Sequence, residues 1–397
     1  MANEYNPKKE RTMINIKKIA QAGMVGLTLL SSQVLAEDPI KIGVAVGLSG
    51  ANSVVAPGVV QSSELAVSQI NASGGILGRQ VELEIVDDAS GAVGAQQAFN
   101  TLILRQNVDA IIAMETSAAR NAALPVVSRG KVPYIYTSFY EGKSCNKWMY
   151  VNGWVPEQQV TPVVDYLSEN EGAKTFFLVG NDYSFGRGML GFTKDYIEEV
   201  GGKVVGEEYL PIDSSNWTSI ISKIRSVKPD ALISATAGGA PNVSLIKQLK
   251  SSGLSVHYGN LAVDEGTART LGDDATDMYM SASYLTSIDS PENQAFKQAL
   301  KEKFGDDMKT PNELSVPQYE AFFLYKAAVE KVGSTDSAKV IEALDDVSYT
   351  GPRGAIQMNK SRHTPITMRL AQVQADGSID ILETFANVQP NDQCPQY

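Results

Sequence analysis

Apolar and polar positions alternate along most of the chain with two different periods. Short runs rich in Val, Ile and Ala are followed by segments whose apolar residues recur at helical spacing. In the first part of the chain the expected strands are 40–46, 81–86, 110–114 and 134–136, and the expected helices are 59–70, 95–105 and 118–128. Strands that alternate with helices of about 10–15 residues indicate right-handed βαβ crossovers and a mostly parallel sheet.

The same alternation starts again after residue 153. The expected strands are now 175–179, 203–209, 231–235 and 278–282, and the expected helices are 156–168, 188–200, 217–226 and 241–251. Two more helices, 291–304 and 317–332, precede short strands at 355–358 and 368–373. We therefore expect an α/β fold of two doubly wound, Rossmann-like lobes joined by a multi-strand hinge. The expected division is 37–153 plus 284–360 for lobe 1 and 154–283 plus 361–397 for lobe 2.

The first 36 residues differ from everything that follows. A basic stretch precedes an apolar run from Ile19 to Leu30 and the tripeptide Val34-Leu35-Ala36. Because the apolar run is shorter than the roughly twenty residues of a spanning helix, it indicates a secretory signal peptide, cleaved after Ala36, and export to the periplasm. An uncleaved anchor is the alternative, and either Met1 or Met13 can be the initiator.

The remaining chain is acidic. The formal charge of the full sequence is −11, and residues 1–36 carry five positive and two negative side chains, so removing their +3 leaves −14. An acidic surface argues against nucleic acid or anionic lipid as a partner.

Cysteine and histidine are both scarce. The chain has two cysteines, Cys145 and Cys394, and an exported protein meets an oxidising compartment, so a disulfide between them is expected, with two unpaired thiols as the alternative. The two histidines, His257 and His363, lie in no zinc-binding pattern. We expect neither a metal site nor a cofactor.

The candidate chemistry lies in the loops that follow the expected strands. In open α/β sheets ligands bind beyond the carboxyl ends of the strands, where helix N-termini present free N–H groups. These loops combine hydroxyls, small residues, aromatics and carboxylates, which suits a small polar solute. The candidates are Glu115, Thr116, Ser117, Ser138, Tyr183, Phe185, Gly238, Asp264 and Glu265. Thr116, Ser117 and Asp264 can equally be helix caps, and the aromatics can equally pack between the lobes.

Enzyme motifs are missing from the sequence. Residues 47–51 resemble a nucleophile elbow but lack its second glycine, and neither a dinucleotide-binding nor a P-loop glycine pattern is present. Both histidines are distant in sequence from the candidate loops, which disfavours a Ser-His-Asp triad. We expect a binding protein that catalyses no reaction.

Several motifs resemble those of a known family. They are Ile40-Lys41-Ile42-Gly43-Val44, Leu48-Ser49-Gly50, Ile70-Asn71, Gly74-Gly75-Ile76-Leu77-Gly78-Arg79 and Ile85-Val86-Asp87-Asp88. Together they resemble the type I periplasmic binding proteins, and more narrowly the branched-chain amino acid and amide/urea binding group of ABC transporters. Stretches such as Tyr140-Glu141-Gly142 and Asp182-Tyr183 resemble the amide and urea side of that group.

The resemblance implies roles for particular residues. Ligand contacts in such relatives correspond to Ser117, Tyr136, Ser138, Tyr183 and Phe185. In the amino-acid binders, the position of Ser117 meets the ligand carboxylate and an acidic residue at Asp264 or Glu265 meets the ammonium. The chain departs from both groups at Glu115 and from the amide binders at Phe185, where Tyr is common.

The resulting hypothesis is a periplasmic substrate-binding component of an ABC importer. It would act as a monomer, take a branched-chain or other amino acid into the cleft between its lobes, and pass it to a permease. A protein that binds or senses short amides or urea is the alternative with the same fold.

Overall fold

The computed structural model describes residues 38–89, 91–391 and 393–396. The expected signal peptide and its cleavage after Ala36 lie outside these residues. Within the described part of the chain, no helix has both the length and the apolar character needed to cross a membrane.

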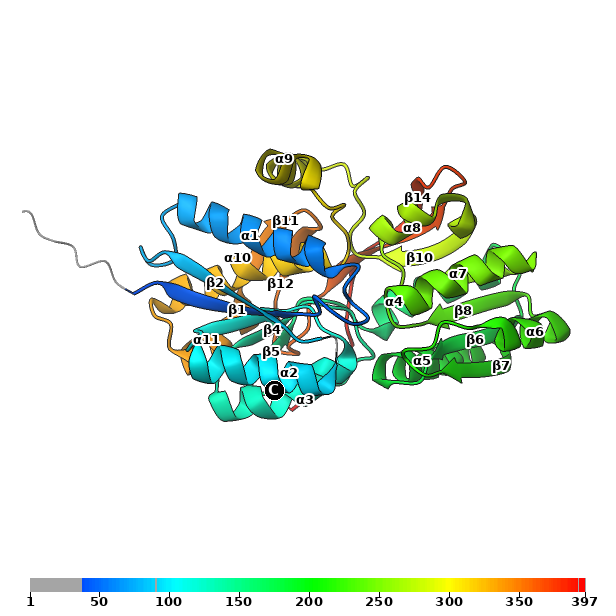
Figure 1. The fold of residues 1–397 in the computed structure, drawn as a ribbon, viewed down its shortest axis with the longest axis horizontal. Helices are drawn as coiled ribbons and strands as arrows, with labels where there is room; N and C mark the ends of the chain where they lie inside the picture. The colour runs from blue at the N-terminus through cyan, green and yellow to red at the C-terminus, as the bar shows by residue number, and fades with distance from the viewer. Residues whose placement is uncertain (1–37, 90, 392, 397) are drawn as a thin grey trace, which may run out of the picture. The chain divides into compact units, whose positions relative to one another are not determined.

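The first sheet has five parallel strands. They pair in the order β2 (Val81–Asp87), β1 (Ile40–Val46), β3 (Ala110–Ala113), β4 (Tyr134–Tyr136) and β5 (Met149–Val151). The residues of β3, β4 and β5 are all buried, as expected for a parallel sheet covered on both faces. In Figure 1 one face carries α1 (Ala56–Ala72) and α10 (Ser315–Val332), and the other carries α2 (Ala92–Asn100) and α3 (Ser117–Gly130). A π-helical turn, Thr101–Arg105, continues α2.

The second sheet has seven strands. They pair in the order β14 (Ile379–Val388), β13 (Ile366–Val373), β10 (Met278–Ala282), β9 (His257–Asn260), β8 (Ala231–Ala235), β6 (Thr175–Asn181) and β7 (Lys203–Leu210). The pairings of β13 with β10 and with β14 are antiparallel, and the others are parallel. The helices of this lobe are α4 (Pro156–Glu169), α5 (Ser184–Glu199), α6 (Thr218–Val227), α7 (Ala240–Ser252) and α8 (Glu265–Leu271), which is followed by the 3₁₀ turn Gly272–Ala275.

The chain returns to the first lobe after β10. Helix α9 (Pro291–Phe304) and α10 both pack against α1. The 3₁₀ turn Gly305–Asp307 follows α9. The segments after α10 are α11 (Ser337–Ala343), the 3₁₀ turn Leu344–Asp346, and a hairpin of β11 (Ser348–Gly351) and β12 (Gly354–Gln357).

Three segments connect the two sheets, and a buried arginine joins two of them. The crossings are residues 152–155, 283–290 and 358–365. Arg353, in the turn of the β11–β12 hairpin, donates from Nη2 to Asn152 Oδ1 (3.0 Å) and from Nη1 to Ser283 Oγ (3.2 Å). Its Nε donates to the buried carboxylate of Glu320 (2.6 Å). The first and second crossings are therefore held at one point.

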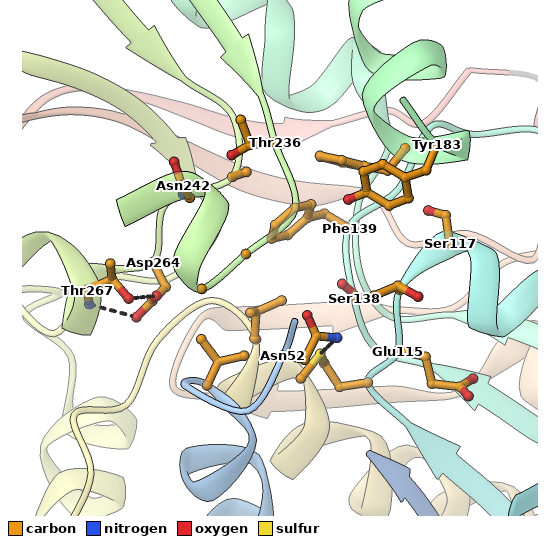
Figure 2. Close-up of a pocket in the computed structure, with 18 residues that line it drawn as sticks. Asn52, Glu115, Ser117, Ser138, Phe139, Tyr183, Thr236, Asn242, Asp264 and Thr267 are labelled. Atoms are coloured by element: carbon orange, nitrogen blue, oxygen red, sulfur yellow. Dashed lines mark hydrogen bonds between the residues drawn. The ribbon is translucent and has the colours of Figure 1, made fainter. Parts of the chain in front are cut away.

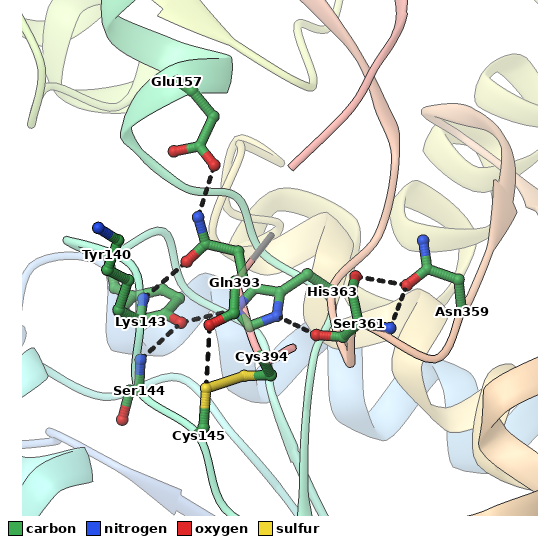
Figure 3. The surroundings of a disulfide bond; sticks show 10 residues. All are labelled: Tyr140, Lys143, Ser144, Cys145, Glu157, Asn359, Ser361, His363, Gln393 and Cys394. Carbon is green, nitrogen blue, oxygen red and sulfur yellow. Dashed lines mark hydrogen bonds between the residues drawn. A yellow bond between two sulfur atoms is a disulfide. The ribbon is translucent and has the colours of Figure 1, made fainter. Parts of the chain in front are cut away.

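The C-terminal tail is bonded to the first lobe. Cys145 and Cys394 form a disulfide across a sequence separation of 249 residues, with their Cα atoms 5.7 Å apart (Figure 3). The adjacent Gln393 accepts from the backbone N–H of Lys143 (2.6 Å) and donates to Glu157 of α4 (2.5 Å). The expected disulfide is therefore present, and the tail contacts elements of both lobes.

Candidate ligand-binding site

A cavity lies where the carboxyl ends of strands from the two sheets face each other. Its walls come from the loops after β1, β3 and β4 in the first lobe and after β6, β8 and β9 in the second (Figure 2). Eight of the ten candidate residues line it: Glu115, Thr116, Ser117, Ser138, Tyr183, Phe185, Gly238 and Asp264. Loops distant in sequence meet here because parallel strands end at the same edge of a sheet.

Tyr136 and Glu265 are buried outside the cavity wall. The Tyr136 hydroxyl donates to the backbone carbonyl of Glu115 (2.9 Å), so it supports the loop after β3 from behind. The Glu265 carboxylate accepts from Arg269 Nε (2.8 Å) and from the backbone N–H of Thr286 (2.7 Å). Because Thr286 lies in the second crossing, Glu265 ties α8 to that crossing.

The first-lobe wall is built on the start of α3. Thr116 is the N-cap, and its hydroxyl accepts from the backbone N–H of Ala119 (3.2 Å). The Ser117 hydroxyl donates to the carboxylate of Glu141 (2.5 Å). The same carboxylate accepts a hydrogen bond from Arg120 Nη2 (2.8 Å). Capping and cavity lining therefore coincide at this helix end.

Glu115 lines the cavity but has its carboxyl group enclosed by protein. Its Oε2 accepts from the Tyr134 hydroxyl (2.6 Å). Burial, and after it the charge of nearby Asp88, raises the pKa of Glu115 well above its ordinary value.

Aromatic rings form one side of the cavity. The Phe139 and Phe185 ring centroids are 5.4 Å apart, and those of Tyr183 and Phe185 are 6.0 Å apart. Burial raises the pKa of Tyr183 well above its ordinary value, so its hydroxyl stays protonated. These rings exclude water from the bound solute.

The second-lobe wall holds one carboxylate, Asp264. It is the N-cap of α8, and its Oδ1 accepts from the backbone N–H of Thr267 (3.0 Å) and from Asn312 Nδ2 (3.0 Å). The Thr267 hydroxyl bonds the other oxygen. Asn312 precedes α10 of the first lobe, so Asp264 bonds directly across the two lobes.

Comparison with known proteins decides the family. Residues 39–378 match the family of periplasmic binding proteins. The chain belongs to this family. The likeness confirms the type I periplasmic binding protein of ABC transporters that the sequence motifs indicated.

Relatives of this binding protein cover nearly its whole length. The Leu/Ile/Val-binding protein homolog 6 of Brucella melitensis biotype 1 is 24% identical over 372 residues, which are 90% of this chain and 93% of that protein. An ABC-transporter solute-binding protein from R. palustris, solved with 4-hydroxybenzoate, has a TM-score of 0.82 at 23% identity, over 89% of this chain and 99% of that one. LivJ of Streptococcus pneumoniae, solved with isoleucine, has a TM-score of 0.78 at 21% identity, over 87% and 99%. These structures confirm the two-lobed α/β fold.

Six helices of this binding protein begin at the cavity. The N-caps of α1, α3, α5, α7, α8 and α10 all line it: Val55, Thr116, Tyr183, Gly239, Asp264 and Leu314. None of its described lining residues is Lys, Arg or His. Helix N-termini carry partial positive charge and unpaired N–H groups, so the cavity can hold an anionic group without a basic side chain.

Four polar residues that line the cavity were not among the candidates: Asn52, Thr236, Asn242 and Thr267. Thr236 belongs to a loop that follows an expected strand, so the search for candidates in such loops could have included it. Asn52 and Asn242 lie near a helix start, where a polar residue more often serves as a cap. Nothing in their sequence surroundings marks them as lining residues.

At the described positions, no group of three or more His, Cys, Asp or Glu side chains is arranged to hold a metal ion.

Proposed function

We propose that this periplasmic binding protein captures an amino acid and delivers it to an ABC-transporter permease. The observation that carries the proposal is the meeting of helix N-termini with the carboxylate of Asp264 around a cavity with apolar and aromatic walls. The helix ends suit a ligand carboxylate, and Asp264 suits an ammonium group. Ser117 at the start of α3 would add a hydroxyl contact to the carboxylate, with its O–H turned from Glu141 to the ligand.

An aromatic monocarboxylate is the second candidate. Asp264 already accepts three hydrogen bonds from Thr267 and Asn312, which lowers its need for a cationic partner. The ring pair of Phe139 and Phe185 would pack against an aromatic body. The R. palustris relative solved with 4-hydroxybenzoate gives this candidate a precedent within the fold. Short amides and urea, the alternative drawn from the sequence, lack an anion for the helix ends.

Delivery to a permease requires export. We propose that the chain acts as a monomer in the periplasm after cleavage behind Ala36. N-terminal sequencing of protein from the periplasmic fraction should begin at Glu37, and recovery of an intact leader on soluble cytoplasmic protein would contradict export.

The ligand class can be tested on purified mature protein. A thermal-shift screen against amino acids, benzoates, short amides and urea should raise the melting temperature with one of the acid classes, since a ligand at about 100 times its Kd adds about 2.7 kcal/mol of stability. Ser117→Ala should then weaken binding by about 1–2 kcal/mol.

Asp264→Asn separates the two acid classes, because Asn retains the capping role at α8. Calorimetry should show a loss of more than about 2 kcal/mol for an amino acid, whose ammonium needs the charge, and little change for a benzoate. Wild-type affinity in both the Ser117 and the Asp264 variants would mean that the ligand binds elsewhere.

A further inference from the structure

We infer that Thr236 and Asn242, beside the start of α7, form a second subsite that binds an oxygen acceptor at the end of the ligand remote from its carboxylate. The inference rests on the proposed function, because it concerns the same cavity. It adds the requirement that the ligand carry a carbonyl, hydroxyl or carboxylate oxygen at its far end.

The first observation is the uncapped start of α7. This helix has 13 residues, and its N-cap Gly239 has no side chain to bond the first-turn N–H groups, which have no partners within a helix. Gly239 has φ +70°, and a Cβ there would come within 2.4 Å of the carbonyl oxygen of Ala51. Glycine is therefore required at this position, and the helix end stays open to the cavity.

The second observation is an unused hydroxyl at the same place. Thr236 lines the cavity, is 1% exposed, and its Oγ1 has no hydrogen-bond partner among the described residues. A buried hydroxyl without a partner is costly, and such groups in native proteins usually have a reason. A ligand oxygen in the cavity would supply the missing partner.

The third observation is the fixed orientation of the Asn242 amide. Asn260 Nδ2 donates to Asn242 Oδ1 (2.8 Å) and to the Tyr258 hydroxyl (2.8 Å), while Asn260 Oδ1 accepts from the backbone N–H of Ala262 (2.9 Å). With its oxygen engaged by Asn260, Asn242 has Nδ2 left as a donor. Asn242 lines the cavity, so this donor is available to a ligand.

All three groups can donate to the same kind of ligand atom. A helix N-terminus, a threonine hydroxyl and an amide Nδ2 favour an oxygen acceptor, and no lining residue of the described chain is a cation that would demand a full negative charge. Figure 2 shows Thr236 and Asn242 across the cavity from Ser117. The two lobes therefore present donors to opposite ends of the ligand.

The test uses ligand pairs that differ at the far end. Leucine and asparagine are similar in shape, but only asparagine has a side-chain oxygen; benzoate and 4-hydroxybenzoate differ by one hydroxyl. Calorimetry on the wild-type protein should show at least about tenfold tighter binding of the oxygen-bearing member of one pair, because a site built for a hydrogen bond rejects the analogue that lacks it.

Thr236→Val keeps the shape and removes the hydroxyl. This variant should lose most of the preference for the oxygen-bearing ligand, while the affinity of the other pair member stays within about twofold. Asn242→Asp, which replaces the donor by an acceptor, should weaken the oxygen-bearing ligand further. The matched control is Ser281→Ala, which removes another buried hydroxyl without a partner among the described residues, on β10 and outside the cavity lining.

The outcomes separate the two proposals. If the wild-type protein binds the members of each pair equally or prefers leucine and benzoate, or if Thr236→Val leaves the preference unchanged, the subsite is refuted and the proposed function stands. If no amino acid and no benzoate binds, both fail. A circular-dichroism melt of Thr236→Val should show a midpoint no lower than that of the wild type, since no hydrogen bond of the described chain is lost.

Discussion

Glu115 is a carboxyl group enclosed by protein on the wall of a binding cavity. It is 1% exposed, and its pKa is raised by burial and by Asp88. A second enclosed carboxyl, Glu313, has its pKa raised by burial and then by Asp264. Both groups therefore make the stability of the protein depend on pH in the same direction.

The sign follows from linkage. A group whose pKa is higher in the folded protein than in the unfolded chain contributes its full stability below the unfolded value, about 4.3 for Glu, and loses it as the pH rises through the folded value. Glu115→Gln keeps an acceptor for Tyr134 and cannot ionise. Its free energy of unfolding, from urea titrations at several pH values above about pH 5, should therefore fall less with pH than that of the wild type.

The exposed Glu82→Gln serves as the control for that comparison. Parallel curves for the wild type and Glu115→Gln would show that Glu115 is ionised in the folded protein throughout this range, so that its pKa is not raised. Some slope should remain in Glu115→Gln, because Glu313 is still present.

Single residues of the site were only partly predictable. Ser117 could be anticipated because it follows the strand expected at 110–114 and begins a helix. Asp264 was also chosen as a candidate, although neither strand β9 nor helix α8, between which it lies, was among the expected elements. Tyr136 was expected to face the ligand, yet its hydroxyl bonds the backbone of Glu115. Which way a side chain points from a strand end depends on packing between distant segments, and the sequence of the loop does not contain that information.

Helix α5 contacts the first lobe at a glycine. A Cβ on Gly188 would lie 2.3 Å from Cβ and 2.8 Å from Cγ of Glu141. Glu141 cannot move freely, because it bonds Ser117 and Arg120. The arrangement of the two lobes seen here therefore needs glycine at this turn of α5.

Gly188→Ala should weaken ligand binding by about 1–3 kcal/mol, the usual cost of overpacking, because the added methyl opposes the approach of α5 to Glu141. The matched control is Gly191→Ala on the same helix, where an added Cβ meets nothing within 4 Å. That control should bind normally and melt slightly higher, since alanine favours a helix by up to about 1 kcal/mol. Equal affinity of the two variants would show that α5 does not approach Glu141 in the bound protein.

At the level of elements, the parallel core could be anticipated and the second sheet's antiparallel edge only in part. The strands of the βαβ units have compact apolar runs, and the helix expected at 241–251 is α7 (Ala240–Ser252). Strand β14 was not expected, because it has no apolar run and most of its residues, such as Glu383, are at least partly exposed. Its pairing with β13 is set by the sheet edge, which no local pattern reveals. The strand expected at 355–358 is β12 of a separate hairpin.

The disulfide acts on both lobes because it closes a loop that contains nearly all of the second lobe and the later segments of the first. Residues 145 and 394 are separated by 249 positions, and Gln393 beside the bond contacts both the loop at Lys143 and helix α4. Closing so long a loop restricts the unfolded chain more than the folded one.

Replacing both cysteines by serine should lower the free energy of unfolding by about 2–4 kcal/mol. Chemical denaturation of the variant and of the oxidised wild type measures the difference. The intact mass of the native protein without reductant should be lower than that of the reduced protein by two hydrogens. Two alkylatable thiols in the native protein would contradict the bond.

Arg353, which joins the first and second crossings, can influence the affinity of this binding protein without changing its specificity. The cavity determines which solute fits. The affinity also depends on the fraction of unliganded protein whose lobes already adopt the binding arrangement, because the apparent Kd is the intrinsic Kd divided by that fraction. Arg353 contacts Glu320, Asn152 and Ser283 and is not among the cavity's lining residues. Substitutions around Arg353 can therefore change the affinity for every ligand by the same factor. During evolution the affinity could then rise or fall while the ligand specificity stays the same.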